Sequence, residues 1–108
     1  MITPEQLETA LAMLTDEEAA AEAWITALRA ENECDLVYAK LFLSSNQGSV
    51  EARKLWAQAH PDYQTVKERW IEARADLKAY EARINGAEAI RSLYQTQSAN
   101  ARQSEWIR

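Results

Sequence analysis

Side chains that commonly carry out catalysis are sparse in this chain. It has one histidine, His60, and one cysteine, Cys34, and they fall on different segments. No Gly-rich phosphate loop, metal-ligand spacing or Ser/His/Asp set accompanies them. We interpret His60 as a helix-end residue before a proline and Cys34 as a small buried residue. We therefore expect no enzyme, no cofactor and no metal site.

Acidic side chains are the next candidates for chemistry. Two groups stand close in sequence: Glu17, Glu18 and Glu22, and Glu31, Glu33 and Asp35. Metal sites in helical bundles use inward Glu and Glu-x-x-His spacing, which is missing, so a solvated acidic face is expected. Residues 1–60 carry ten acids against four bases, whereas residues 61–108 carry seven against eight. This polarity disfavours general duplex-DNA binding but leaves the second half able to contact an anion.

Basic and aromatic residues recur near the end of the chain. They are Arg91, Tyr94, Arg102, Trp106 and Arg108. Such side chains can stack on bases and contact phosphates of single-stranded nucleic acid. Alternatively they form a basic helix end, favoured by the helix dipole, with Trp106 packed on Leu11 or Leu14. We favour the second interpretation because the group is sparse.

Two apolar seams at helical spacing must position these residues. One comprises Ala20, Ala23, Ala27, Ala30, Cys34, Val37 and Leu41, and the other Val66, Trp70, Ala73, Leu77, Tyr80, Ile84 and Ala87. Folding one back on the other pairs Leu41 with Val66, Cys34 with Ala73 and Ala30 with Leu77. Because large side chains mostly meet small ones, the pattern predicts a close antiparallel pair of helices.

The sequence predicts one all-α domain, residues 1–108, with few glycines and prolines. Its parts are an N-terminal helix (1–15), a first arm (16–45), a short connecting helix (49–60) and a second arm (61–108) whose end can fray. The arms form an antiparallel, coiled-coil-like two-helix hairpin, and we expect it to dimerise into a helical bundle.

Capping residues mark most of these boundaries. Thr3-Pro4-Glu5 begins the first helix, and Ser49 caps the connecting helix. Thr15 opens a capping box, so the chain either bends there, which we favour, or continues as one helix. Gly48 is expected to adopt the left-handed conformation.

The second arm has two ambiguous points. His60-Pro61 ends the connecting helix, and the arm begins between Pro61 and Thr65, where Thr65 offers another capping box. Asn85-Gly86 could break the helix, but the seam resumes beyond it. We therefore expect either a weak point in a continuous helix or a site of close backbone approach.

Several large apolar residues lie off the seams. Trp24, Ile25, Leu28 and Tyr38 form the expected partner or oligomer interface, because a two-helix hairpin has only one internal face. A second copy of the chain is the simplest occupant.

Two segments carry a family resemblance. Ala39-Lys40-Leu41-Phe42-Leu43 with Gly48-Ser49-Val50-Glu51-Ala52-Arg53-Lys54, and a long helix with Ile90-Arg91-Ser92 and Ala99-Asn100-Ala101-Arg102, resemble small phage and prophage proteins of mostly unassigned function. Such proteins are often neighbours of recombination genes. The resemblance spans roughly residues 39–102 and implies phage origin but no activity.

Together these patterns favour a non-catalytic protein-interaction module. With the resemblance, we expect a phage-encoded accessory protein or inhibitor that binds and modulates a host or phage nucleic-acid-processing protein. The alternative is a single-stranded DNA-binding accessory factor in phage recombination. No apolar run approaches the roughly 20 residues that span a bilayer, so no membrane role is expected. Without a signal-peptide pattern, we expect the cytoplasm of a bacterial host.

Overall fold

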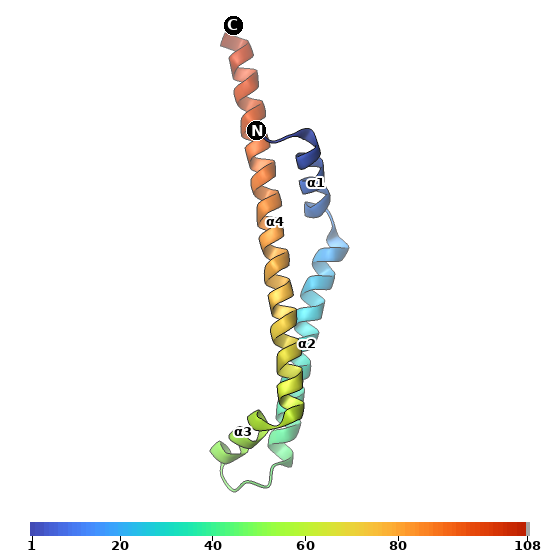
Figure 1. The fold of residues 1–108 in the computed structure, drawn as a ribbon, viewed down its shortest axis with the longest axis vertical. Coiled ribbons are helices and arrows are strands. Elements are labelled where there is room, and N and C mark those ends of the chain that lie inside the picture. Colours follow the sequence, from blue (N-terminus) through green and yellow to red (C-terminus); the bar gives the residue numbers. More distant parts are fainter. Residues whose placement is uncertain (108) are drawn as a thin grey trace. The chain divides into compact units, whose positions relative to one another are not determined.

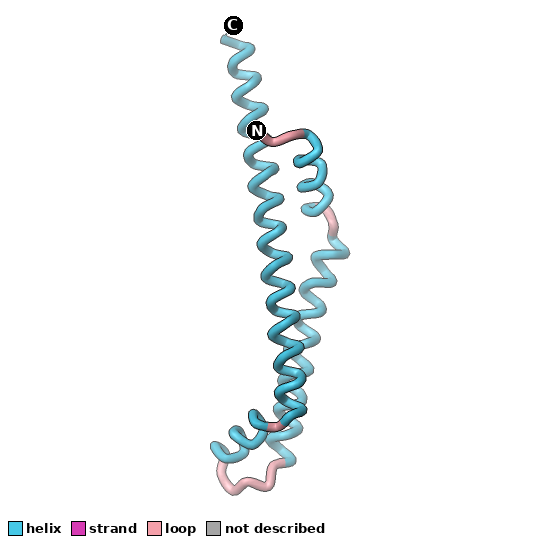
Figure 2. The backbone as a smooth tube through the Cα atoms, in the orientation of Figure 1, coloured by secondary structure: helices cyan, strands magenta, loops and turns pink. Residues whose placement is uncertain are grey.

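Four helices account for nearly all of the chain. The computed structural model describes residues 1–107, which contain α1 (Pro4–Leu14), α2 (Glu17–Ser44), α3 (Val50–Ala59), α4 (Pro61–Ile107) and no strand (Figures 1 and 2). The predicted all-α hairpin with a short connecting helix and an N-terminal helix is confirmed. The chain divides into two compact units: unit 1 is Met1–Ala20 with Ala79–Arg108, and unit 2 is Ala21–Lys78.

Unit 2 is the helical hairpin. In Figure 1, α2 and the first part of α4 run antiparallel, and α3 connects them. Their separation is small enough for Arg69 Nη1 to lie 3.1 Å from Glu33 Oε1. The buried residues between the two arms are Ala27, Cys34, Val66, Ala73 and Leu77, all of them predicted seam positions. Small side chains thus let the two arms approach closely.

The predicted pairing of the two arms is wrong by about one helical turn. In that register Tyr38 lies level with Arg69, about 9 Å along α4 from Tyr63 at 1.5 Å per residue. The structure instead packs the Tyr38 ring against the Tyr63 ring. The Arg69–Glu33 pair departs from the predicted register in the same direction.

Aromatic packing off the seam explains this shift. The Tyr38 ring lies 5.5 Å from the Tyr63 ring and 6.4 Å from that of Phe42, between centroids. A slide of one turn keeps the seams in contact, so seam spacing alone does not distinguish the two registers. The contact of Tyr38 on α2 with Tyr63 on α4 does, whereas the contact of Tyr38 with Phe42 lies within α2.

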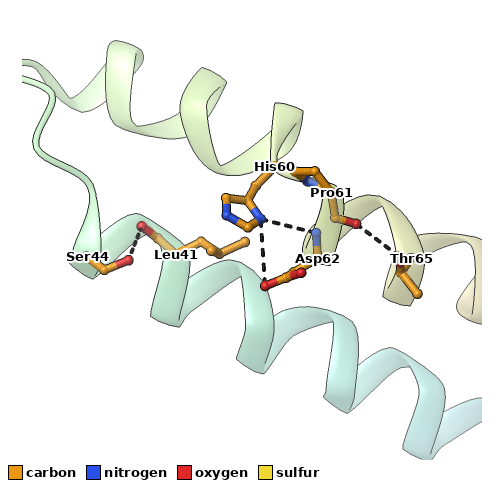
Figure 3. A network of polar contacts seen from close by, with 6 residues as sticks. All are labelled: Leu41, Ser44, His60, Pro61, Asp62 and Thr65. Atoms are coloured by element: carbon orange, nitrogen blue, oxygen red, sulfur yellow. Dashed lines mark hydrogen bonds and ion pairs between the residues drawn. The ribbon is translucent and has the colours of Figure 1, made fainter.

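Capping at the ends of α3 follows the sequence in part. The Ser49 hydroxyl accepts a hydrogen bond from Ala52 N, as predicted. His60 ends α3, and its Nδ1 accepts from Asp62 N at 3.1 Å at the start of α4 (Figure 3). Thr65 is not a cap, because α4 has already begun and its hydroxyl donates to Pro61 O. Gly48 lacks the expected left-handed conformation: none of the described glycines has a positive φ, and the five-residue loop between α2 and α3 gives the chain room to turn without one.

Unit 1 contains α1 and the second part of α4. Thr3 caps α1, with Pro4 in its first turn, as predicted. Gln97 ties the start of the chain to α4: its side-chain oxygen accepts from Ile2 N, and its nitrogen donates to Ile2 O. Ala10 and Ala87 are buried in this unit.

The chain bends between α1 and α2, as favoured from the sequence. The capping residue is Asp16, whose carboxylate accepts from Ala19 N, and not Thr15. The Thr15 hydroxyl donates to Leu11 O at 2.8 Å and ends α1 instead. A hydroxyl that is already bonded to the preceding turn is not available to cap the following helix.

α4 is continuous through Asn85-Gly86 and extends to Ile107. A Cβ atom built on Gly86 would meet nothing within 4 Å. Gly86 is therefore a weak point in a continuous helix and not a site of close backbone approach.

Candidate protein-interaction surfaces

An apolar groove runs between the two arms of unit 2. Its volume is about 300 Å³, and we call it the Trp24 groove. It is lined by Trp24, Ala27, Leu28 and Glu31 of α2 and by Trp70, Arg74 and Leu77 of α4. Trp24 is 52% exposed and Leu28 51%. The groove thus presents apolar surface to solvent, with one acid on one wall and one base on the other.

The small seam residues create this groove. Ala27 and Leu77 are buried at its floor, so the helix backbones come close while the larger Trp24 and Leu28 are left at the edge. Arg74 lies over the Trp70 ring, 5.8 Å from its centroid, a distance suited to a cation–π contact. The α4 wall of the groove therefore places the positive charge of Arg74 over the face of the Trp70 ring.

The predicted interface residues separate into two groups. Trp24, Ile25 and Leu28 are all exposed on α2. Tyr38 is half-buried and packs its ring against Tyr63 and Phe42. The sequence analysis did not assign Trp70 and Arg74 to an interaction surface. Trp70 is a seam residue, and Arg74 is one of many charged residues on α4 that were expected to be solvated.

Cys34 is buried and Tyr63 half-buried in unit 2, and each influences the pKa of the other. Burial raises the pKa of the Cys34 thiol, and the charge of Asp35 raises it further, whereas the Tyr63 hydrogen bond and Lys67 lower it. Burial also raises the pKa of Tyr63, as does its contact with Cys34. Lys67 Nζ lies 5.7 Å from the Tyr63 ring centroid. Both groups are held in their neutral forms, which suits packing and not nucleophilic chemistry.

His60 has a structural position, as predicted. Besides its bond to Asp62 N, Nδ1 lies 3.8 Å from the Asp62 carboxylate (Figure 3). The His60 ring also lies 5.3 Å from that of Trp56, between centroids. Among residues 1–107 no group of three or more His, Cys, Asp and Glu side chains could hold a metal ion.

The predicted nucleic-acid-contact residues that the structure describes near the end of α4 lie in different environments and do not form one surface. Arg91 forms an ion pair with Glu88, and its Nε is buried without a hydrogen-bond partner. Tyr94 is half-buried, whereas Arg102 and Trp106 are exposed. Arg108 lies outside the described residues.

Trp106 does not pack on Leu11 or Leu14. It is 90% exposed on the last turns of α4, so that part of the helix-end interpretation is wrong. The helix extends too far beyond the residues that α1 contacts, since Ile2 at the start of the chain is already bonded to Gln97.

The described residues contain no helix with both the length and the apolar character needed to cross a membrane. Searches of protein-family models, curated proteins and solved structures give no match to this chain.

Proposed function

We propose that this chain is a non-catalytic protein-interaction module that binds an amphipathic helix of another protein in the Trp24 groove. The observation that carries the proposal is the pair of half-exposed side chains, Trp24 and Leu28, beside Trp70 in one groove. A helix laid between two antiparallel helices completes a three-helix packing, the usual mode of helix-in-groove recognition.

Charge on the groove walls defines the partner helix further. Glu31 lies on the α2 wall and Arg74 on the α4 wall. A complementary helix would carry a basic residue on the side facing α2 and an acidic residue on the side facing α4. Fully burying a leucine stabilises a complex by about 1.5 to 3 kcal/mol, and Leu28 still has about half of its surface to contribute.

The class of partner is proposed from charge and resemblance. Residues 1–60 carry ten acids, and carboxylates on a helix can occupy positions that phosphates take in a nucleic-acid-binding protein. With the phage resemblance, this favours an accessory protein or inhibitor acting on a nucleic-acid-processing protein in the cytoplasm of a bacterial host.

Capture from bacterial lysate followed by binding with the purified partner tests this proposal. The wild type should retain a nucleic-acid-processing protein, and titration should shift the tryptophan fluorescence as Trp24 is buried. Trp24→Ala and Arg74→Glu should weaken binding by about tenfold or more, as expected for central interface residues. Leu55→Ala is the matched control, because Leu55 is exposed on α3 away from the groove. Equal binding by Trp24→Ala and wild type would refute the groove as the site.

A second candidate function is single-stranded DNA binding by the end of α4. The observation that favours it is the exposure of Trp106 one helical turn from Arg102. Gel shifts on oligothymidine at low and moderate salt should then be lost in Trp106→Ala with Arg102→Gln, but kept in Arg83→Gln on the same helix. An unchanged shift in the double variant would exclude this end of the helix.

A further inference from the structure

α2 has a second apolar face besides the one that packs on α4. Ile25, Leu28, Leu36 and Leu43 are 45% to 77% exposed, all within unit 2. Leu36 follows the buried Cys34 by two residues, which places it about 200° around the helix, on the opposite side from the seam. We call this face the outer stripe: Ala21, Ile25, Leu28, Asn32, Leu36, Ala39 and Leu43.

The outer stripe repeats every eleven residues. Ala21, Asn32 and Leu43 follow this interval, as do Ile25 with Leu36 and Leu28 with Ala39. Eleven residues make three turns at about 3.67 residues per turn, close to the natural period of the helix. The stripe therefore stays on one face over its whole length, as a surface for packing another helix does.

We propose that a second copy of the chain covers the outer stripe, with the two α2 helices antiparallel and Asn32 on the two-fold axis. The spacing of the stripe is the same in both directions from Asn32. Antiparallel pairing therefore sets Ile25 against Ala39, Leu28 against Leu36 and Ala21 against Leu43 of the second copy. A two-fold interface must be self-complementary, and here two of the three pairs match a large side chain with alanine.

Charges along one edge of the stripe fit the same pairing. Glu22, Arg29, Glu33 and Lys40 lie along this edge. In the antiparallel dimer Glu22 faces Lys40 of the second copy, which gives each dimer two pairs of opposite charge. Arg29 also lies opposite Glu33, but the Glu33 carboxylate already has a partner 3.1 Å away in Arg69 of its own chain. The other edge sets Glu31 near Asp35 of the second copy, which adds two pairs of like charge at solvent-exposed positions.

Asn32 at the centre gives the pairing its register. Two asparagine amides that meet on a two-fold axis can donate to and accept from each other. A slide by one turn would leave each amide against a leucine, and polar residues within an apolar seam specify register in this way. This dimer uses the outer face of α2 and does not require the Trp24 groove, with which it shares Leu28 and, at its edge, Glu31.

Sedimentation equilibrium of the full chain tests the dimer first. The wild type should have twice the 12.3 kDa chain mass at micromolar concentration. Leu36→Glu should raise the dissociation constant about a hundredfold or more, because each dimer loses two buried leucines. Leu55→Glu, an equally exposed leucine on α3, should leave the mass unchanged. A monomeric wild type, or a dimer unaffected by Leu36→Glu, would overturn the proposal.

A charge exchange tests the pairing without disturbing the apolar face. Lys40→Glu alone should weaken the dimer by about tenfold, since it sets two glutamates against each other twice. The double variant Glu22→Lys with Lys40→Glu restores opposite charges and should recover the wild-type dissociation constant. Failure of the second change to restore dimerisation would refute the antiparallel register even if the chain dimerises.

Cross-linking tests the orientation directly. In a Cys34→Ala background, Asn32→Cys should form a disulfide-linked dimer on mild oxidation because the two thiols meet on the axis. Leu43→Cys should not, because its counterpart lies at the opposite end of the interface. Cross-linking of both variants would indicate parallel helices and contradict the proposal. The dimer and the Trp24 groove are tested separately: a wild-type chain that dimerises as described but binds no partner helix would refute only the Trp24 groove.

Discussion

At the scale of single residues, burial is the largest influence on the pKa values of Cys34 and Tyr63 in unit 2. The Cys34 thiol is 4% exposed and within reach of the Tyr63 hydroxyl, on the arm opposite to its own. The sequence interpretation of Cys34 as a small seam residue agrees with this burial, but its tyrosine partner was not predicted. Tyr63 lies off the seam, and nothing in the spacing of the chain indicates which side chain would turn toward the thiol.

This contact predicts an alkaline limit to stability. Burial first, then neighbouring negative charge, raises the pKa of Cys34 above its ordinary value of 9.0, and burial and Cys34 raise that of Tyr63 above 10.0. Because the folded pKa values are the higher ones, the stabilisation is complete below pH 9 and is lost as the pH rises through the folded values. Urea unfolding between pH 7 and pH 11 should show this decline.

Cys34→Ala is the control for this prediction. It removes the thiol titration and part of the tyrosine shift, so its free energy of unfolding should decline less above about pH 9 than that of the wild type. Identical pH profiles for the two proteins would mean that the contact does not influence folding.

At the scale of the helix, Gly86 lowers the stability of α4 without a structural need for glycine at this position. The residue is helical, has no positive φ, and has open space where a Cβ would lie. Gly86→Ala should therefore raise the free energy of unfolding by about 0.5 to 1 kcal/mol, since glycine loses more backbone entropy than alanine.

Thermal and urea unfolding measure this gain. Ala89→Gly, at an exposed position one turn further along α4, should lower stability by about 1 kcal/mol and serves as the reverse substitution. A loss of stability in Gly86→Ala would show that the helix needs a bend or a close approach at this point.

At the scale of the whole chain, the register of the arms decides which surfaces unit 2 exposes. Ala27 shares the floor of the Trp24 groove with Leu77, whereas Ala30 lines a separate, polar groove together with Ala73. Both grooves follow from the observed register, one turn from the register that the seams predict.

Two substitutions distinguish these registers. Ala27→Leu should cost about 1 to 3 kcal/mol by overpacking against Leu77, and Ala30→Leu should cost less because it meets Ala73 beside an open groove. Ala75→Leu, exposed on α4, is the neutral control. Melting temperatures rank the three variants, and a larger loss in Ala30→Leu would restore the register in which it faces Leu77.

Local features of the sequence determined the helices themselves. Helix ends could be predicted at Thr3 with Pro4, at Ser49 and at His60-Pro61, because these residues act on neighbours a few positions away. The 3-4 spacing of apolar residues identified every buried residue between the arms. Only the tertiary structure decided the register and the grooves that follow from it. Seam contacts are nearly equivalent after a slide of one turn, whereas the packing of Tyr38 on Tyr63 joins residues far apart in sequence and selects one arrangement. Capping at Asp16 instead of Thr15 is a local choice that the sequence pattern did not resolve, because the Thr15 hydroxyl bonds to Leu11 O of the preceding turn.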